Sequence, residues 1–284
     1  MFLLKGTIDG SKKLFIGRLF GIGLTFISGL LIIRTLGVEE YGRWALLQAI
    51  FSTISVLVGF RTIEALTFHI IKSRENNNLS QRDLLVSSAV TVDFLVTSFL
   101  FFIGVFFVGV YQKYALDSAL TSNLLIWSYS LSILPNFLSN TWTSITRIQD
   151  KYQRMVSIPL LIVFIKLISV SGLWLTNMLS MTSLILLTVF INLIQGFIQY
   201  RDINIWLKAE RLPSLKISLL NLPWRNSVLS DFWDMLRAGF ITSSITGAVK
   251  KADVLFLGYW RDESDVGIYN LAKNLVSIVQ SPFS

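Results

Sequence analysis

The sequence contains no cysteine and a single histidine, His69. The absence of cysteine excludes disulfides, thiolate metal sites and cysteine nucleophiles. A lone histidine with no obvious acidic partner is weak support for an acid–base catalyst such as an acyltransferase. We therefore expect a protein that is not an enzyme and that has no metal site and no cofactor.

Charged side chains are also scarce. They make up 15% of the 284 residues, whereas a soluble domain carries about 25%. Hydrophobic residues make up 53% of the chain, and the mean hydropathy is +0.62. The net charge is +8, but the basic residues lie scattered in short loops between apolar runs, which is typical of the positive-inside rule. The composition predicts a membrane protein and argues against a nucleic-acid partner.

Apolar runs near the spanning length of about 20 residues recur along the chain. An eighth run begins near Val266, and the seven before it cover Leu14–Leu36, Trp44–Ile71, Leu84–Tyr111, Leu124–Ile145, Val156–Thr176, Ser180–Tyr200 and Phe232–Trp260. Lys and Arg are enriched in the amino-terminal segment and in alternate connections, so the amino terminus is predicted to be cytoplasmic. We predict an all-α, polytopic membrane helical bundle in contact with the lipid bilayer.

The one long connection, residues 201–231, mixes apolar and basic side chains. This pattern predicts an amphipathic cytoplasmic linker with a helix lying in the membrane interface, and a solvated loop is the alternative. The linker would divide an N-terminal lobe of six transmembrane helices, residues 1–200, from residues 232–284. The latter are expected to be the first helices of a second, incomplete and apparently truncated lobe.

Polar side chains occur at helical spacing within two of the spans. They are Ser128, Ser132, Pro135, Ser139 and Thr143 on the fourth, and Thr188, Asn192, Gln195 and Gln199 on the sixth. Such stripes face either other helices or water, so they predict interhelical hydrogen bonds or a hydrated cavity.

Lys166 lies in the middle of the fifth span, where an ammonium costs roughly 2.5 to 3.5 kcal/mol on insertion scales. It could snorkel or pair with an acid, but the pattern favours a wet cavity lined by cations. The candidate substrate-binding cations are Arg18, Arg61, Lys166, Arg237, Lys250 and Lys251. Arg18 could instead mark the inner interface, and the last two are loop charges if the seventh helix ends near Ala248.

Three acidic residues are candidates for ion or proton coupling. They are Glu64, Asp93 and Asp253. Glu64 lies three residues after Arg61, so an intrahelical ion pair between these two is an alternative role for both.

Two segments resemble a known family. Arg34-Thr-Leu-Gly-Val-Glu-Glu-Tyr-Gly42 is similar to the first-loop signature of polysaccharide biosynthesis flippases. Residues 253–258 and 266–272 resemble the seventh-helix and eighth-helix region of the same family. These are the O-antigen (Wzx-like) and capsule-unit transporters of the MATE-like superfamily.

The resemblance implies a MATE-like fold in two six-helix lobes. It implies a flippase that moves undecaprenyl-diphosphate-linked O-antigen or capsule repeat units from the cytoplasmic to the periplasmic leaflet of a bacterial inner membrane. A glycan polymerase and chain-length proteins are the implied partners. This assignment would also account for buried cations, because they can replace the hydration of a diphosphate.

Two alternative functions stay open. A cation-coupled multidrug exporter of the same superfamily would call for buried acids, and the first span contains none. A membrane-embedded glycosyltransferase could use Glu39 and Glu40 to bind a metal. A polysaccharide polymerase, by contrast, would be expected to carry a large outward loop, and the predicted outward loops are short.

Overall fold

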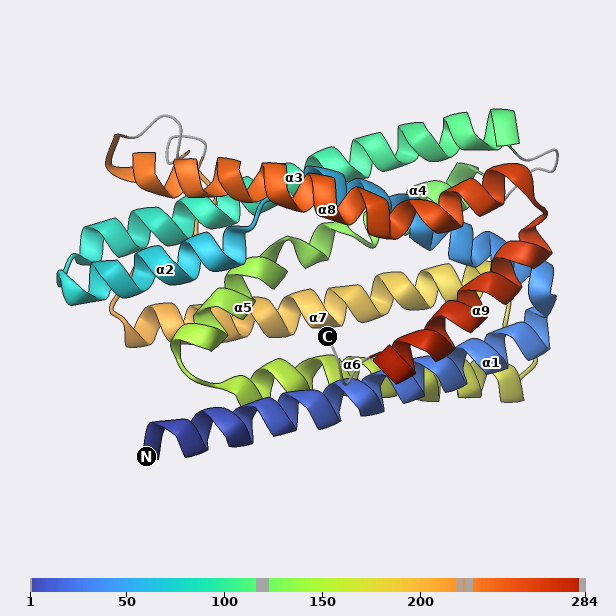
Figure 1. Cartoon of the computed structure of the whole chain (residues 1–284), viewed down its shortest axis with the longest axis horizontal. Coiled ribbons are helices and arrows are strands. Elements are labelled where there is room, and N and C mark those ends of the chain that lie inside the picture. Colours follow the sequence, from blue (N-terminus) through green and yellow to red (C-terminus); the bar gives the residue numbers. More distant parts are fainter. Residues whose placement is uncertain (1, 116–122, 219–221, 223–226, 281–284) are drawn as a thin grey trace.

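The structure, a computed structural model, describes residues 2–115, 123–218, 222 and 227–280. Every regular element in these ranges is a helix, and most helices run roughly along one long axis (Figure 1). They are α1 Phe2–Val58, α2 Thr62–Glu75, α3 Leu79–Ala115, α4 Asn123–Leu131, η1 Leu134–Leu138 (a 3-10 helix), α5 Ser139–Ile148, α6 Tyr152–Leu175, α7 Met181–Ala209, η4 Ser227–Leu229 (a 3-10 helix), α8 Ser230–Trp260 and α9 Glu263–Gln280. The predicted all-α membrane bundle is confirmed.

Four helical stretches among the described residues are long and apolar enough to cross a membrane. They are Phe15–Val58, Leu79–Phe106, Tyr152–Leu175 and Met181–Ala209. Large apolar side chains are exposed on them, and Phe197 on α7 is 67% exposed. A continuous exposed apolar surface of this kind suits contact with lipid rather than water.

Helix α1 contains a sharp turn at Gly37, which separates the first predicted span from the second. The backbone there has φ 86° and ψ 168°, a conformation that is essentially restricted to glycine. Gly267 of α9 packs against this turn, and a Cβ atom on Gly267 would lie 2.6 Å from the carbonyl oxygen of Val38. The first-loop and eighth-helix segments that carry the family resemblance therefore meet at one end of the bundle.

Two predicted spans are each broken in the middle, so the prediction of continuous helices over Trp44–Ile71 and Leu124–Ile145 was wrong. In the second span α1 ends at Val58 and α2 begins at Thr62. Serine hydroxyls on α8 compensate this break, because Ser244 donates to the carbonyl oxygen of Leu57 at 2.8 Å and Ser243 donates to that of Gly59 at 2.9 Å. In the fourth span, η1 interrupts the path between α4 and α5.

The connection after the sixth span differs from the predicted interfacial helix. Its first residues, up to Ala209, continue α7, and residues 212–218 have no regular secondary structure. This irregular segment is bound to α3, because the Ser218 backbone N–H donates to the Thr91 hydroxyl at 3.1 Å and the Ser87 hydroxyl donates to the Lys216 carbonyl oxygen at 3.2 Å. These contacts are distant in sequence, so the helical pattern of apolar residues could not reveal them.

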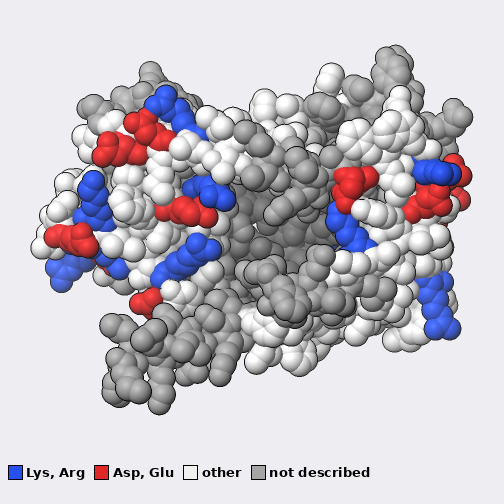
Figure 2. Space-filling view, in the orientation of Figure 1, with Lys and Arg blue, Asp and Glu red and all other residues white. Residues whose placement is uncertain are grey.

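The chain connections alternate between the two ends of the bundle. The amino terminus and the α2–α3, α5–α6 and α7–α8 connections share one end, and the α1 turn and the α6–α7 and α8–α9 connections share the other (Figure 1). Charged residues group toward both ends of the face in Figure 2. At the first end Glu210 accepts hydrogen bonds from Arg74 and Arg82, each at 2.5 Å, which ties α7 to α2 and α3. Which end is cytoplasmic stays a prediction.

Candidate functional site

A polar cavity lies inside the bundle where the broken spans meet. Its volume is about 670 Å³, and residues of α1, α3, α4, η1, α5, α7 and α8 line it. We call it the polar chamber. Amide and aromatic side chains face it, including Gln48, Asn136, Asn192, Phe51, Phe60 and Phe137. A cavity of this size, with aromatic walls and a few amide groups, is typical of small-ligand sites.

A second cavity of about 360 Å³ adjoins the polar chamber. Lys166 of α6 and Lys273 of α9 line it together with Tyr41 and Asn270. We call it the lysine cavity. Gln48 and Ser52 line both cavities, so the two spaces share a wall on α1.

Lys166 is half-buried in the lysine cavity. Within the described part of the chain, neither a hydrogen bond nor an ion pair joins its ammonium to another residue. An uncompensated ammonium at this depth is costly unless water or an anionic ligand solvates it. The structure thus places Lys166 as the sequence predicted, facing a cavity, and its role in binding stays a prediction.

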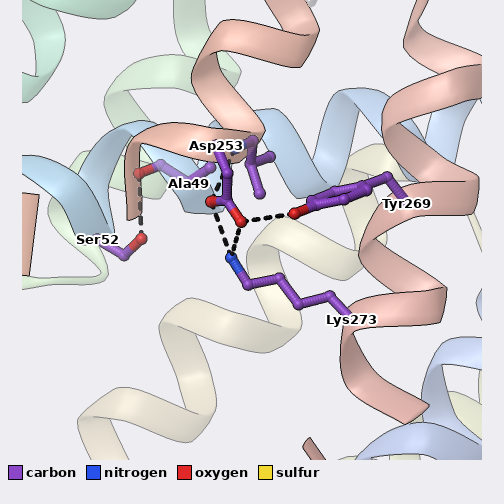
Figure 3. A network of polar contacts seen from close by, with 6 residues as sticks. Ala49, Ser52, Asp253, Tyr269 and Lys273 are labelled. Carbon is purple, nitrogen blue, oxygen red and sulfur yellow. Dashed lines mark hydrogen bonds and ion pairs between the residues drawn. The ribbon is translucent and has the colours of Figure 1, made fainter. Parts of the chain in front are cut away.

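Lys273 belongs to a small polar network between α8 and α9 (Figure 3). Its ammonium donates to both carboxylate oxygens of Asp253, at 2.8 and 2.6 Å, and the Tyr269 hydroxyl donates to Asp253 at 2.7 Å. Asp253, a candidate for ion coupling, therefore accepts hydrogen bonds from these two side chains and also from the Val254 backbone N–H, at 2.9 Å. The sequence analysis missed Lys273, because it placed no charged candidates in the eighth run. The available signal was a lysine one helical turn after Tyr269 and Asn270.

Asp93 is buried beside the polar chamber, with an exposed fraction of 4%. The Thr62 hydroxyl and the Asn140 amide donate to its Oδ1 atom at 2.8 and 3.1 Å, and the Thr141 hydroxyl donates to its Oδ2 atom at 3.5 Å. These bonds join α2, α3 and α5 around one carboxylate. Asp93 is thus an acid at the wall of a polar cavity, and its role in ion or proton coupling stays a prediction.

The polar stripes predicted on the fourth and sixth spans face each other. The Asn192 amide donates to the Ser132 carbonyl oxygen at 2.9 Å, and the Gln199 amide donates to the Ser139 hydroxyl at 3.1 Å. Asn192 and Ser132 also line the polar chamber. The predicted interhelical hydrogen bonds are therefore present, and part of both stripes also lines a cavity, whose hydration stays a prediction.

Four predicted site residues lie outside the linings of both cavities, namely Asp253, whose partners are given above, and Arg61, Glu64 and Arg237. Arg61 and Glu64 are exposed, and no ion pair between these two described residues is formed. Arg237 is also exposed, and it pairs with Asp234 and lies over the Trp233 ring at 5.7 Å. Their participation in binding stays a prediction.

The side chains of Arg18, Lys250 and Lys251 lie outside the described residues. The helix that carries the last two does continue to Trp260, so it does not end near Ala248. Lys250 and Lys251 therefore lie within a helix rather than in a loop, and their role in binding stays a prediction.

Glu39 and Glu40, the metal-binding candidates of the glycosyltransferase alternative, both bond to Arg43, at 2.6 and 2.9 Å. Among the described residues no group of three or more His, Asp or Glu side chains converges as a metal site would require. The arrangement of these glutamates is that of a helix-surface ion pair.

Comparison with known proteins gives one positive result. A family model described as Polysaccharide biosynthesis protein matches residues 9–284. No curated protein matches the chain. No solved structure matches it either.

Proposed function

Because the chain belongs to the polysaccharide biosynthesis protein family, we propose that it is a flippase for a lipid-linked oligosaccharide. The cargo would be an O-antigen or capsule repeat unit on undecaprenyl diphosphate, moved from the cytoplasmic to the periplasmic leaflet of a bacterial inner membrane. The amino terminus would be cytoplasmic, and the lobes would rock about a central site in a MATE-like manner.

One observation carries this proposal: two lysines, one from each predicted lobe, line a cavity that adjoins the polar chamber. A diphosphate cannot cross hydrocarbon unaided, and ammonium groups can replace its hydration with charge-assisted hydrogen bonds. Lys166 is without a protein partner among the described residues, so its donors are available to such a ligand. The lipid tail would stay outside, along the exposed apolar surface.

The test is translocation of an undecaprenyl-diphosphate oligosaccharide in proteoliposomes that contain the full chain. We expect Lys166→Met to reduce the rate at least about tenfold, which corresponds to the loss of one charge-assisted contact. Lys151→Met, at an exposed position between α5 and α6, is the matched control and should keep the rate. Equal rates for both variants would remove the lysine cavity from the transport path.

A multidrug exporter is the second candidate, and the buried carboxylate of Asp93 at the polar chamber is the observation that favours it. Export of a cationic dye from the same proteoliposomes distinguishes the two functions. Dye export without glycan translocation would favour the exporter and overturn the flippase.

A further inference from the structure

The polar chamber and the lysine cavity differ in charge. Lys166 and Lys273 line the lysine cavity, whereas Asp93 is the charged residue among those that line the polar chamber. Gln48 and Ser52 form the wall that both spaces share. A ligand that reached past these side chains from one space into the other would move from a cavity lined by lysines to one lined by a carboxylate.

The chamber walls are suited to uncharged sugars. The amides of Gln48, Asn136 and Asn192 provide both donors and acceptors for hydroxyl and acetamido groups. Phe51 and Phe137 provide apolar faces against which a sugar ring can pack. The volume of about 670 Å³ lies within the range of ordinary small-ligand sites, so it can hold a short oligosaccharide.

Asp93 limits which ligands can bind in the polar chamber. Its three hydrogen bonds come from Thr62, Asn140 and Thr141, all of them neutral donors. None of these donors carries a positive charge, so none of them cancels the charge of Asp93 when its carboxylate is ionised. A second negative charge in the same low-dielectric chamber would be repelled.

We propose that the polar chamber is a sugar subsite that selects neutral glycans and rejects sugars that carry a carboxylate, such as uronic acids. This inference rests on the proposed function, since it assigns the diphosphate to the lysine cavity and the attached glycan to the polar chamber. Asp93 is then a specificity-determining residue that acts by its charge.

The test uses three synthetic probes: farnesyl diphosphate, and the same lipid joined to N-acetylglucosamine or to glucuronic acid. Dissociation constants are measured from tryptophan fluorescence with the full chain in nanodiscs. We expect the glucuronic acid probe to bind about tenfold more weakly than the N-acetylglucosamine probe. Asp93→Asn should bring this ratio close to one, mainly by tightening the binding of the acidic probe.

A second variant adds charge instead of removing it, so the test does not depend on the folding of Asp93→Asn. Asn136→Asp places a carboxylate on the wall of the polar chamber and should raise the ratio by a further factor of about ten. Asn204→Asp makes the same change at a half-buried position on α7 that lies outside the linings of both cavities, and it should leave the ratio unaltered. Binding of farnesyl diphosphate should be the same in wild-type and Asn204→Asp protein and should be lost in Lys166→Met.

The possible results separate the two proposals. If farnesyl diphosphate binds and needs Lys166, but both sugar probes bind equally, the selection by charge is overturned and the flippase proposal stands. An Asn136→Asp ratio equal to that of the wild type would also overturn the selection. If none of the probes binds, the flippase proposal fails and this inference fails with it.

Discussion

Asp93 joins three helices through one buried carboxylate, and this makes it costly to truncate. In Asp93→Ala the donors of Thr62, Asn140 and Thr141 lose their acceptor in a buried site. We expect a loss of about 3 kcal/mol in the free energy of unfolding, against about 1 kcal/mol for Asp93→Asn, which keeps an acceptor oxygen. Thermal unfolding in detergent compares the two variants. Equal midpoints would show that the three hydrogen bonds contribute little.

The pair of Lys273 and Asp253 is only partly shielded, with side chains 38% and 36% exposed. Its contribution should therefore be modest, about 0.5 to 1 kcal/mol. Lys273→Met is expected to lower the unfolding midpoint in detergent, and adding Asp253→Asn should recover part of the loss because the unpaired carboxylate is then removed. A double variant no more stable than Lys273→Met would contradict the pairing.

The sequence predicted the position of a polar side chain only where its neighbours along the chain determine that position. Lys166 was found because an ammonium in an apolar run avoids lipid and faces a cavity or an acidic partner instead. Lys273 and Gln48 were not found, because their position at the cavities depends on contacts between α1, α6 and α9. The exposed positions of Arg61 and Glu64 lie beside the break before α2, which the apolar pattern does not show.

The contact between α9 and the α1 turn depends on a glycine. A methyl group at Gly267 would meet the Val38 carbonyl oxygen at 2.6 Å, and this backbone atom cannot move away without shifting the turn. We expect Gly267→Ala to cost about 1 to 3 kcal/mol. Gly23→Ala, where nothing lies within 4 Å of the added carbon, is the control and should be neutral or slightly stabilising. Equal unfolding midpoints for the two variants would contradict this close approach.

Helices were predicted well where one apolar run corresponds to one uninterrupted segment, as in α6 and α7. The predictions failed at the breaks around Gly59 and in η1, because the polar groups freed there are satisfied by partners distant in the chain or by the local 3-10 turn. The irregular segment 212–218 is a further case, since Ser87 and Thr91 of α3 form hydrogen bonds with its backbone. The spacing of apolar residues shows which side chains avoid water, but it does not show which distant residues supply hydrogen bonds.

The two predicted lobes touch where α2 faces α8, and this contact offers a test of relative motion. A Cβ atom on Gly239 would lie 2.7 Å from the Cβ atom of Arg61, so cysteines at both positions need only a small shift to reach disulfide geometry. The native chain has no cysteine, so no other disulfide can compete. We expect oxidation of the Arg61→Cys/Gly239→Cys variant to stop glycan translocation and reduction to restore it.

The single variants Arg61→Cys and Gly239→Cys control for loss of the native side chains, and their rates should not respond to oxidant. Unchanged transport by the cross-linked protein would show that α2 and α8 need not separate during the cycle. The division of the chain into two moving lobes would then have to be abandoned.

The packing of Gly267 on the Gly37 turn has an evolutionary consequence. Two stretches more than two hundred positions apart share one van der Waals contact, at Val38 and Gly267. A bulkier residue at either position is tolerable only if the other side of the contact changes with it. Across diverging descendants of this protein, substitutions at these sites should accordingly appear together, as a correlated pair in aligned sequences.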